Sequence, residues 1–184
     1  MKPWTTLSRR TLLAHSRFLT VEEHTVQLPD GRVIENWPWL VTPDYVNVAA
    51  ITAEGKFICF RQMKYPLSEA SLAAVGGYIE PGEDPLQAAQ RELLEETGYE
   101  AAEWLPLGSY WVDANRGMSR GHFFLARQAY RAQPPHADDL EEQELLELSR
   151  DELATALSKG DFKIMAWAAI LALALNDLAN PHTG

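Results

Sequence analysis

The stretch that decides the fold runs from Gly76 to Tyr99 and reads GGYIEPGEDPLQAAQRELLEETGY. A loop rich in glycine and proline leads there into a segment with marked helix limits. Asp84 is a good N-terminal cap, Pro85 suits the first helical position, and Gly98 favours termination. We therefore predict a loop followed by a helix that begins at Pro85 and stops at Gly98.

The predicted helix carries acidic side chains on one side. At about 100° per residue, Glu92, Glu95 and Glu96 fall within one narrow sector, while Leu93 lies opposite and can face a core. Glu92 and Glu96 are like charges four residues apart, which weakens a bare helix by about 0.2–0.5 kcal/mol. Their hard oxygens suit Mg²⁺ or Mn²⁺. For three glutamates alone, a solvated acidic face is the common alternative.

The loop before the helix supplies further parts of a site. Arg91 stands beside the carboxylates and can tie this loop to the helix through Glu83. Gly76 and Gly77 permit close backbone approach, so a carbonyl can lie near a metal ion. The loop and the helix together therefore predict one metal-binding unit.

The whole pattern is more specific than its glutamates. From Gly77, five residues lead to Glu83, seven more lead to Arg91, and RELLEETGY then runs to Tyr99. This stretch resembles the Nudix box at every charged and glycine position, with Tyr99 where the family usually has an aliphatic residue. The resemblance implies a Nudix hydrolase of the α/β (α+β) class, with a mixed sheet sandwiched between helices. It also implies cleavage of a nucleoside diphosphate linked to another moiety.

The same resemblance implies a cofactor and roles for the box residues. The expected cofactor is a divalent cation, usually Mg²⁺, with Mn²⁺ as the alternative. Glu92 and Glu96 are the principal expected ligands, Glu95 assists them, and the carbonyl of Gly76 completes the shell. Glu95, Glu96 and Arg91 are the box residues that we expect to serve catalysis.

Strands and two more helices are predicted around the box. Apolar and β-branched runs predict strands over 18–21, 25–28, 33–34, 46–52, 57–60, 110–112 and 122–126. Ser149 and Glu152 form a capping box for a helix that ends near Gly160. A last helix, over about 163–178, is apolar almost all round and should be packed. This order indicates a mixed α/β protein with one core.

The similarity extends beyond the box to one subgroup of the family. Residues 61–66, RQMKYP, resemble the Arg-Gln-x-Arg-Tyr stretch of ADP-ribose pyrophosphatases and related NDP-sugar enzymes. The N-terminal strands match the same subgroup, whose members exchange a small β subdomain between the subunits of a dimer. We therefore expect a dimerising β subdomain over 1–45, a hydrolase domain over 46–184, and a homodimer.

Three departures from that subgroup bear on the substrate. Residues 73–77, AAVGG, lack the Glu and Pro of the usual Glu-Leu-Pro-Ala-Gly; Asn115-Arg116 stands where a proline is expected; and 113–120 lacks a Pro-Gly start. ADP-ribose, or a similar nucleoside diphosphate sugar, is the leading candidate. The alternatives are a nucleotide-binding regulatory module that does not hydrolyse, and a hydrolase that removes oxidised nucleoside triphosphates.

Residues outside the box complete the predicted site. Many family members take a general base from an acidic loop, and Glu141 or Glu142 fits that place, although a solvated charge run is the common alternative. Basic side chains suited to substrate phosphates are Arg61, Lys64 and Arg116, with surface salt bridges as the alternative. Trp37 is predicted to stack on the base, or else to be buried at a subunit contact.

Composition limits the partners. The 184 residues carry a net charge of −10, which argues against an extended nucleic-acid surface and against anionic membranes. A single cysteine, Cys59, cannot form an internal disulfide and suggests a reducing compartment. No signal peptide is recognisable, and the longest apolar run, 164–175, is shorter than the roughly 20 residues of a membrane helix. We expect a soluble, cytoplasmic protein with a small nucleotide substrate.

Overall fold

The computed structural model describes residues 1–135 and 142–180. The chain divides into two compact units. The smaller unit comprises Met1–Asp44 and Tyr110–Gly121, and the larger unit comprises Tyr45–Ser109 and His122–Gly184. Each unit is considered by itself below.

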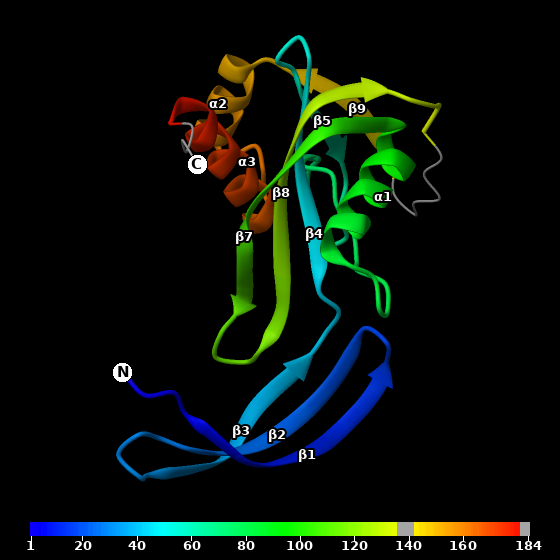
Figure 1. Ribbon diagram of the computed structural model, residues 1–184. Helices are drawn as coiled ribbons and strands as arrows, with labels where there is room; N and C mark the ends of the chain where they lie inside the picture. Colours follow the sequence, from blue (N-terminus) through cyan, green and yellow to red (C-terminus); the bar gives the residue numbers. More distant parts are fainter. Residues whose placement is uncertain (136–141, 181–184) are drawn as a thin grey trace. The chain divides into compact units, whose positions relative to one another are not determined.

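The larger unit is built on a mixed β-sheet (Figure 1). Within the described part of the chain the strand order is β6-β5-β4-β8-β7, and β9 also pairs with β5. The strands are β4 (Tyr45–Thr52), β5 (Phe57–Gln62), β6 (Ser71–Ala73), β7 (Tyr99–Asp113), β8 (Met118–Arg131) and β9 (Gln143–Leu148). β5 runs antiparallel to β4, β6 and β9, whereas β4 and β8 run in the same direction.

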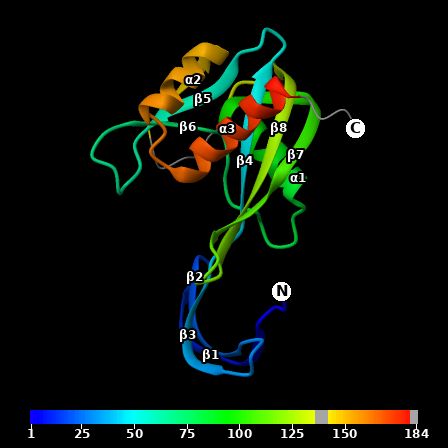
Figure 2. The same cartoon turned by 90° about the vertical axis from the view of Figure 1, so that its left-hand side faces the viewer.

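Helices cover both faces of this sheet. The described residues form α1 (Pro85–Thr97), α2 (Arg150–Lys159) and α3 (Met165–Ala179). Figures 1 and 2 place α1 on one face, and α2 and α3 on the other. The predicted mixed sheet between helices is therefore confirmed.

The helix limits follow the capping residues of the sequence. The side chain of Asp84 accepts hydrogen bonds from the amides of Leu86 and Gln87, and Gly98 ends α1 in the left-handed conformation with φ 74°. Ser149 and Glu152 form the predicted capping box of α2, which ends at Gly160. Because these caps satisfy backbone groups that the helix itself leaves unpaired, their positions set where each helix begins and ends.

The core lies between the central strands and the two helix layers. Val46, Phe57, Leu93 and Ile170 are buried there, one each from β4, β5, α1 and α3. Cys59 is also fully buried in β5, and burial raises the pKa of its thiol to about 12. Cys59 is thus part of the core. Among the described residues no helix is long and apolar enough to span a membrane.

The smaller unit contains a three-stranded antiparallel sheet in the order β1-β2-β3. Its strands are β1 (Thr5–Ser16), β2 (Leu19–Gln27) and β3 (Val33–Val41). A hairpin turn at 29–31 joins β2 to β3, with Gly31 at φ 89°. β1 was not predicted because its sequence carries little hydrophobic alternation. All of its residues are exposed, so none of them needs to be apolar.

The tip of the β7–β8 hairpin also belongs to the smaller unit. The amide of Leu40 donates to the carbonyl of Arg116 at 2.8 Å, and the amide of Ser119 donates to Thr42 Oγ1 at 3.1 Å. The aromatic ring of Trp39 lies so close to Gly117 that a Cβ there would come within 2.0 Å of it. A domain limit at residue 45, with dimerisation through 1–45, stays a prediction.

Candidate functional site

Helix α1 positions the acidic side chains by burying its opposite face. Ala88, Ala89 and Leu93 are fully buried in the core of the larger unit. Because the helical period places residues three or four apart on one side, Glu92 lies beside this buried stripe, four residues after Ala88, whereas Glu95 points away from it. The side chain of Glu92 is 13% exposed and that of Glu95 is 51% exposed. The glutamates therefore differ in their access to solvent.

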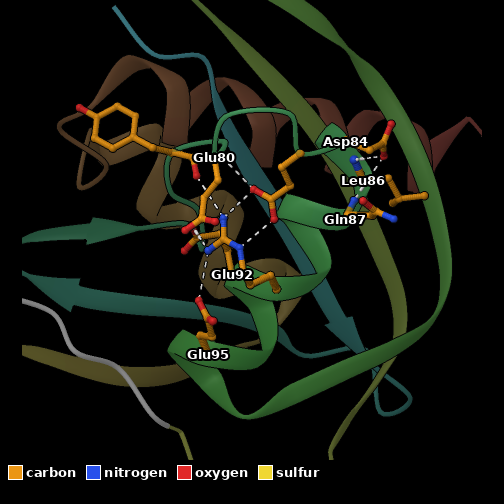
Figure 3. A network of polar contacts seen from close by, with 9 residues as sticks. Glu80, Asp84, Leu86, Gln87, Glu92 and Glu95 are labelled. Atoms are coloured by element: carbon orange, nitrogen blue, oxygen red, sulfur yellow. Dashed lines mark hydrogen bonds and ion pairs between the residues drawn. The ribbon is translucent and has the colours of Figure 1, made fainter. Parts of the chain in front are cut away.

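Arg91 is the centre of a polar network that includes Glu92 and Glu95, both labelled in Figure 3. Its Nε and Nη2 donate to the two carboxylate oxygens of Glu83 at 2.8 and 2.9 Å. Its Nη1 donates to Glu92 Oε1 at 2.8 Å and to Glu95 Oε2 at 3.1 Å. A planar guanidinium offers its donors in a fixed fork, so one side chain holds three carboxylates in place.

The same arginine fixes the loop before the helix. Arg91 Nη2 also donates to the carbonyl of Tyr78 at 3.1 Å, and Glu83 accepts from the amide of Glu80 at 2.9 Å. The guanidinium of Arg91 lowers the pKa of Glu83, and Glu83 in turn raises the pKa of Arg91. The tie between loop and helix that we predicted for Arg91 and Glu83 is present.

Two glycines bring backbone against the carboxylates. The amide of Gly76 donates to Glu96 Oε2 at 3.1 Å. A Cβ at Gly77 would lie 2.3 Å from Glu92 Oε1, so a larger residue there would displace that carboxylate. The sequence thus predicted correctly that the glycines allow a close approach of the backbone.

The donor chemistry of this site fits a divalent cation. Glu92, Glu95 and Glu96 supply hard oxygens beside the Gly76–Gly77 backbone, as Mg²⁺ and Mn²⁺ prefer. Among the described residues, however, no group of three or more acidic, histidine or cysteine side chains is arranged around a common point. The hydrogen bonds to Arg91 and to the amide of Gly76 account for this arrangement, because they draw the carboxylates to different partners.

The acidic segment before β9 is described only in part. Glu141 lies outside the described residues, whereas Glu142 is exposed directly before β9. The next two residues, Gln143 and Glu144, pair with β5 and so belong to a strand rather than to an acidic loop. Glu142 therefore lies directly before a strand of the same sheet that packs against α1.

The proposed substrate-binding residues fall into both units. Arg61 and Lys64 belong to the larger unit, and Arg61 forms an exposed ion pair with Glu144 at 3.0 Å. Trp37 and Arg116 belong to the smaller unit. The ion pair of Arg61 corresponds to the surface salt bridge that was given as the alternative for this residue.

The two residues of the smaller unit already have protein partners. Trp37 is half-buried, donates from its indole to the carbonyl of Asn115 at 2.8 Å, and meets the edge of Trp4. Arg116 pairs with Asp113. If either side chain contacts substrate, it must keep these protein contacts at the same time or give them up.

Asn47 is a polar residue near the site that sequence reasoning missed. It lies in β4, is 4% exposed, and its amide contacts the position of Gly76. The signal was present in the sequence, because Asn47 interrupts the apolar run of 46–51. A buried amide side chain is costly unless it is hydrogen-bonded. A lone Asn in an apolar strand therefore indicates a structural or functional role.

Comparisons with known proteins agree with this geometry. The NUDIX domain model matches residues 41–168, and the model described as nucleoside diphosphate sugar hydrolase N-terminal domain matches residues 4–40. An ADP-ribose pyrophosphatase of Bacillus subtilis is 32% identical over 132 residues, which is 72% of this chain and 70% of that protein. A methanol dehydrogenase activator of Bacillus methanolicus is 32% identical over 139 residues, or 74% of each chain.

More distant relatives are similar over most of the chain. A CMP-5'-(N-acetyl-N-hydroxy-3-aminopropyl)phosphonate hydrolase of Streptomyces rubellomurinus is 29% identical and covers 84% of this chain and 74% of its own. A solved structure titled as an ADP compounds hydrolase superimposes with a TM-score of 0.79 at 23% identity, and covers 99% of this chain and 97% of its own. The last similarity supports the fold, including a β-sheet at the N-terminus.

Proposed function

The chain belongs to the Nudix family and is a Nudix hydrolase, and on this premise we propose that it cleaves ADP-ribose or a related nucleoside diphosphate sugar. The reaction would need Mg²⁺ and would break the diphosphate, giving a nucleoside monophosphate and a sugar phosphate. The observation that carries the proposal is the network around Arg91, which holds Glu83, Glu92 and Glu95 on one loop–helix unit.

The relatives support the substrate class. The Bacillus subtilis relative is named for ADP-ribose, and the Streptomyces relative for a CMP-linked phosphonate. In both names the substrate is a nucleotide joined to a second group. The match of residues 4–40 to an N-terminal domain of nucleoside diphosphate sugar hydrolases points in the same direction.

Carboxylates of α1 would bind the cation, and Arg91 would orient them. We assign Glu92 and Glu96 as the principal ligands, with Glu95 assisting and the carbonyl of Gly76 completing the shell. When bound, the cation neutralises charge on the diphosphate and activates a water for attack on phosphorus. Arg91 would orient the carboxylates, since its donors already contact Glu92 and Glu95. The polypeptide's contribution is thus a set of charges placed before substrate arrives.

Residues outside the box would complete the reaction. We propose Glu142, or Glu141, as the general base that takes a proton from the attacking water. Arg61, Lys64 and Arg116 would contact the phosphates, and Trp37 would stack on the base. For Arg61 this requires an exchange of its partner Glu144, which costs little because both side chains are more than half exposed.

A substrate panel tests the assigned reaction. ADP-ribose, other nucleoside diphosphate sugars and an oxidised dGTP would be incubated with and without Mg²⁺, and phosphate would be released from the products by an added phosphatase. The proposal expects Mg²⁺-dependent turnover of a diphosphate sugar that exceeds turnover of the triphosphate. A faster reaction with oxidised dGTP would favour a hydrolase of damaged triphosphates instead.

One relative favours a second candidate function. Because a 32% identical protein is named as an activator of methanol dehydrogenase, a regulatory module that binds a nucleotide is the alternative. The complete set of box carboxylates in this chain favours hydrolysis. Calorimetry would separate the two functions: tight binding of ADP-ribose without cleavage in Mg²⁺ would support the regulatory module.

A further inference from the structure

Asn47 is a buried side chain with an unsatisfied oxygen. It is 4% exposed and lies between Val46 and Val48, which are fully buried in β4. Its Nδ2 donates to the carbonyl of Val75 over a long 3.4 Å, and its Oδ1 finds no hydrogen-bond donor among the residues that the structure describes. A buried acceptor without a donor destabilises a fold. We therefore expect this oxygen to bind a group that the protein itself does not supply.

The amide of Asn47 lies against the glycine loop of the candidate site. A Cβ at Gly76 would come within 2.4 Å of Asn47 Nδ2 and within 2.2 Å of the carbonyl oxygen of Val46. Gly76 also has a φ of +156°, which side chains rarely adopt. Any side chain at position 76 would therefore collide with the amide of Asn47, and only glycine leaves room for it.

Gly76 also connects Asn47 to the helix carboxylates. The amide of Gly76 donates to Glu96 Oε2 at 3.1 Å, and the carbonyl of the neighbouring Gly77 accepts from the amide of Val46 at 2.9 Å. One short backbone segment thus contacts Glu96 on α1 and the strand segment that carries Asn47. The unsatisfied oxygen lies on a residue next to the proposed cation ligands, not in a remote part of the core.

We propose that Asn47 contributes its Oδ1 to the shell of the divalent cation at α1, either to the ion or to a water that the ion holds. Amide oxygens are hard donors that Mg²⁺ and Mn²⁺ accept. A neutral amide adds an oxygen without adding to the repulsion between Glu92 and Glu96 and without burying a further charge. The inference rests on the proposed metal site and deepens it by adding a ligand from β4.

Binding of Mn²⁺ to the intact protein, without substrate, tests this role. Electron paramagnetic resonance would count free Mn²⁺ in titrations of wild type, Asn47→Val and Asn47→Asp. We expect Asn47→Val to bind Mn²⁺ about tenfold more weakly, the usual size for loss of a supporting group around a metal. Asn47→Asp should bind at least as tightly as wild type, because a carboxylate replaces the amide oxygen.

A stability readout separates the proposed role from a purely structural one. Valine removes the unsatisfied oxygen, so without metal the midpoint of thermal unfolding of Asn47→Val should equal or exceed that of wild type. The increase of the midpoint on adding Mg²⁺ should be smaller than in wild type. Thr52→Val, another buried polar position of β4, is the matched control and should leave Mn²⁺ affinity unchanged.

The outcomes distinguish this inference from the proposed function. If Glu96→Gln weakens Mn²⁺ binding and Asn47→Val does not, the role of Asn47 is refuted while the metal site stands. If neither variant differs from wild type, the metal site itself is refuted and the role of Asn47 with it. Should Asn47→Val fail to fold, weaker Mn²⁺ binding by a folded Asn47→Asp would refute the role in its place.

Discussion

At the scale of single residues, the site depends on the planar fork of Arg91. Its guanidinium donates to Glu83, Glu92, Glu95 and the carbonyl of Tyr78. Lysine keeps the charge but cannot reach four acceptors in a fixed geometry. Arg91 is therefore the residue through which the loop and the helix act as one unit.

We predict that Arg91→Lys lowers the free energy of unfolding by about 1–3 kcal/mol, because partly buried carboxylates lose donors. Urea denaturation followed by circular dichroism measures this change. Arg61→Lys is the matched control, since the pair of Arg61 with Glu144 is more than half exposed and should change stability by less than about 1 kcal/mol. Equal losses in the two variants would contradict the central role of Arg91.

The ion pair of Glu83 predicts a pH dependence of stability. Arg91 lowers the pKa of Glu83 in the folded protein, so the pair stabilises the fold above the unfolded pKa of about 4.3. This stabilisation is lost as the pH falls through the lower folded value. Glu83→Gln should therefore be less stable than wild type at pH 7, and the difference should shrink at pH 3.

Chemical denaturation at the two pH values measures both differences. Glu54→Gln, in the exposed turn between β4 and β5, is the control and should match wild type at pH 7. A difference for Glu83→Gln that stays constant between pH 7 and pH 3 would refute the assigned ion pair.

The sequence allowed some residue contacts to be predicted and concealed others. Arg91 and Glu83 lie eight residues apart on one loop and helix, so local geometry is enough to bring them together. Asn47 contacts Gly76 across two segments of the sheet, and sequence spacing carries no information on such a pair. The composition of 46–51 showed that Asn47 was unusual, but not what it contacts.

At the scale of elements, the residues that follow α1 connect the box to the chain after β8 and to β9. The carbonyl of Gly98 accepts from the amides of Ala132 and Gln133, and the hydroxyl of Tyr99 donates to Glu147 Oε1 in β9 at 2.8 Å. Gly98 is thus hydrogen-bonded to the residues that follow β8, and Tyr99 is hydrogen-bonded to β9. Tyr99, which departs from the usual aliphatic residue of the box, thus has a partner that an aliphatic side chain would lack.

We predict that Tyr99→Phe costs about 1 kcal/mol of unfolding free energy and speeds amide hydrogen exchange in β9. Tyr130→Phe is the matched control: Tyr130 donates to Glu100 at 2.7 Å but is exposed, so its loss should cost less than about 0.5 kcal/mol. Mass spectrometry after exchange locates the effect. Unchanged exchange in β9 of Tyr99→Phe would show that the hydroxyl does not hold the strand.

Elements with strong local signals were predicted well. α1 and α2 carry capping residues at both ends, and their limits agree with the sequence. The last helix begins at Met165, two residues later than expected, and its N-cap Ile164 makes no side-chain hydrogen bond. β1 was missed because its exposed residues form no apolar face, and β9 was missed because its leucines are interspersed with the glutamates of an acidic run.

At the scale of the whole molecule, the smaller unit exposes apolar side chains. Leu7, Leu12 and Leu13 of β1 are about half exposed, at 52%, 54% and 50%, as is Trp4 at 49%. Exposed apolar groups of this kind mark interaction surfaces. They support the proposed homodimer through the N-terminal strands.

We predict a solution mass of twice 20.7 kDa by light scattering at micromolar concentration. Replacing Leu7 and Leu13 with Lys should shift the mass toward the monomer, because charges would then have to be buried at the contact. Lys in place of Leu105, an exposed residue of the larger unit, is the control and should leave the mass unchanged. A wild-type mass of 20.7 kDa would contradict the dimer.

The division of the chain was the least predictable feature. Residues 110–121 lie far along the sequence from β1–β3, yet they belong to the same unit and hydrogen-bond to Leu40 and Thr42. Such long-range pairing is set by tertiary structure, which local patterns do not encode. The family, the sheet between helices and the contact of Arg91 with Glu83 followed from the sequence, because their signals lie within short segments.

The negative charge of the chain is concentrated in particular segments. Residues 80–103 contain eight acidic residues and one arginine, against a net charge of −10 for the whole chain. Much of this acidity lies in the loop and helix around Arg91, where it is held by hydrogen bonds. The site therefore concentrates negative charge where a cation is proposed to bind.

The rate of AMP formation from ADP-ribose tests the central proposal most directly. Wild type and the double variant Glu95→Gln/Glu96→Gln would be compared in Mg²⁺ and after its removal by a chelator. We predict AMP and a sugar phosphate from wild type in Mg²⁺, with a loss of at least about a hundredfold in the double variant or without metal. Wild-type turnover no faster than that of the double variant would contradict the proposed hydrolysis.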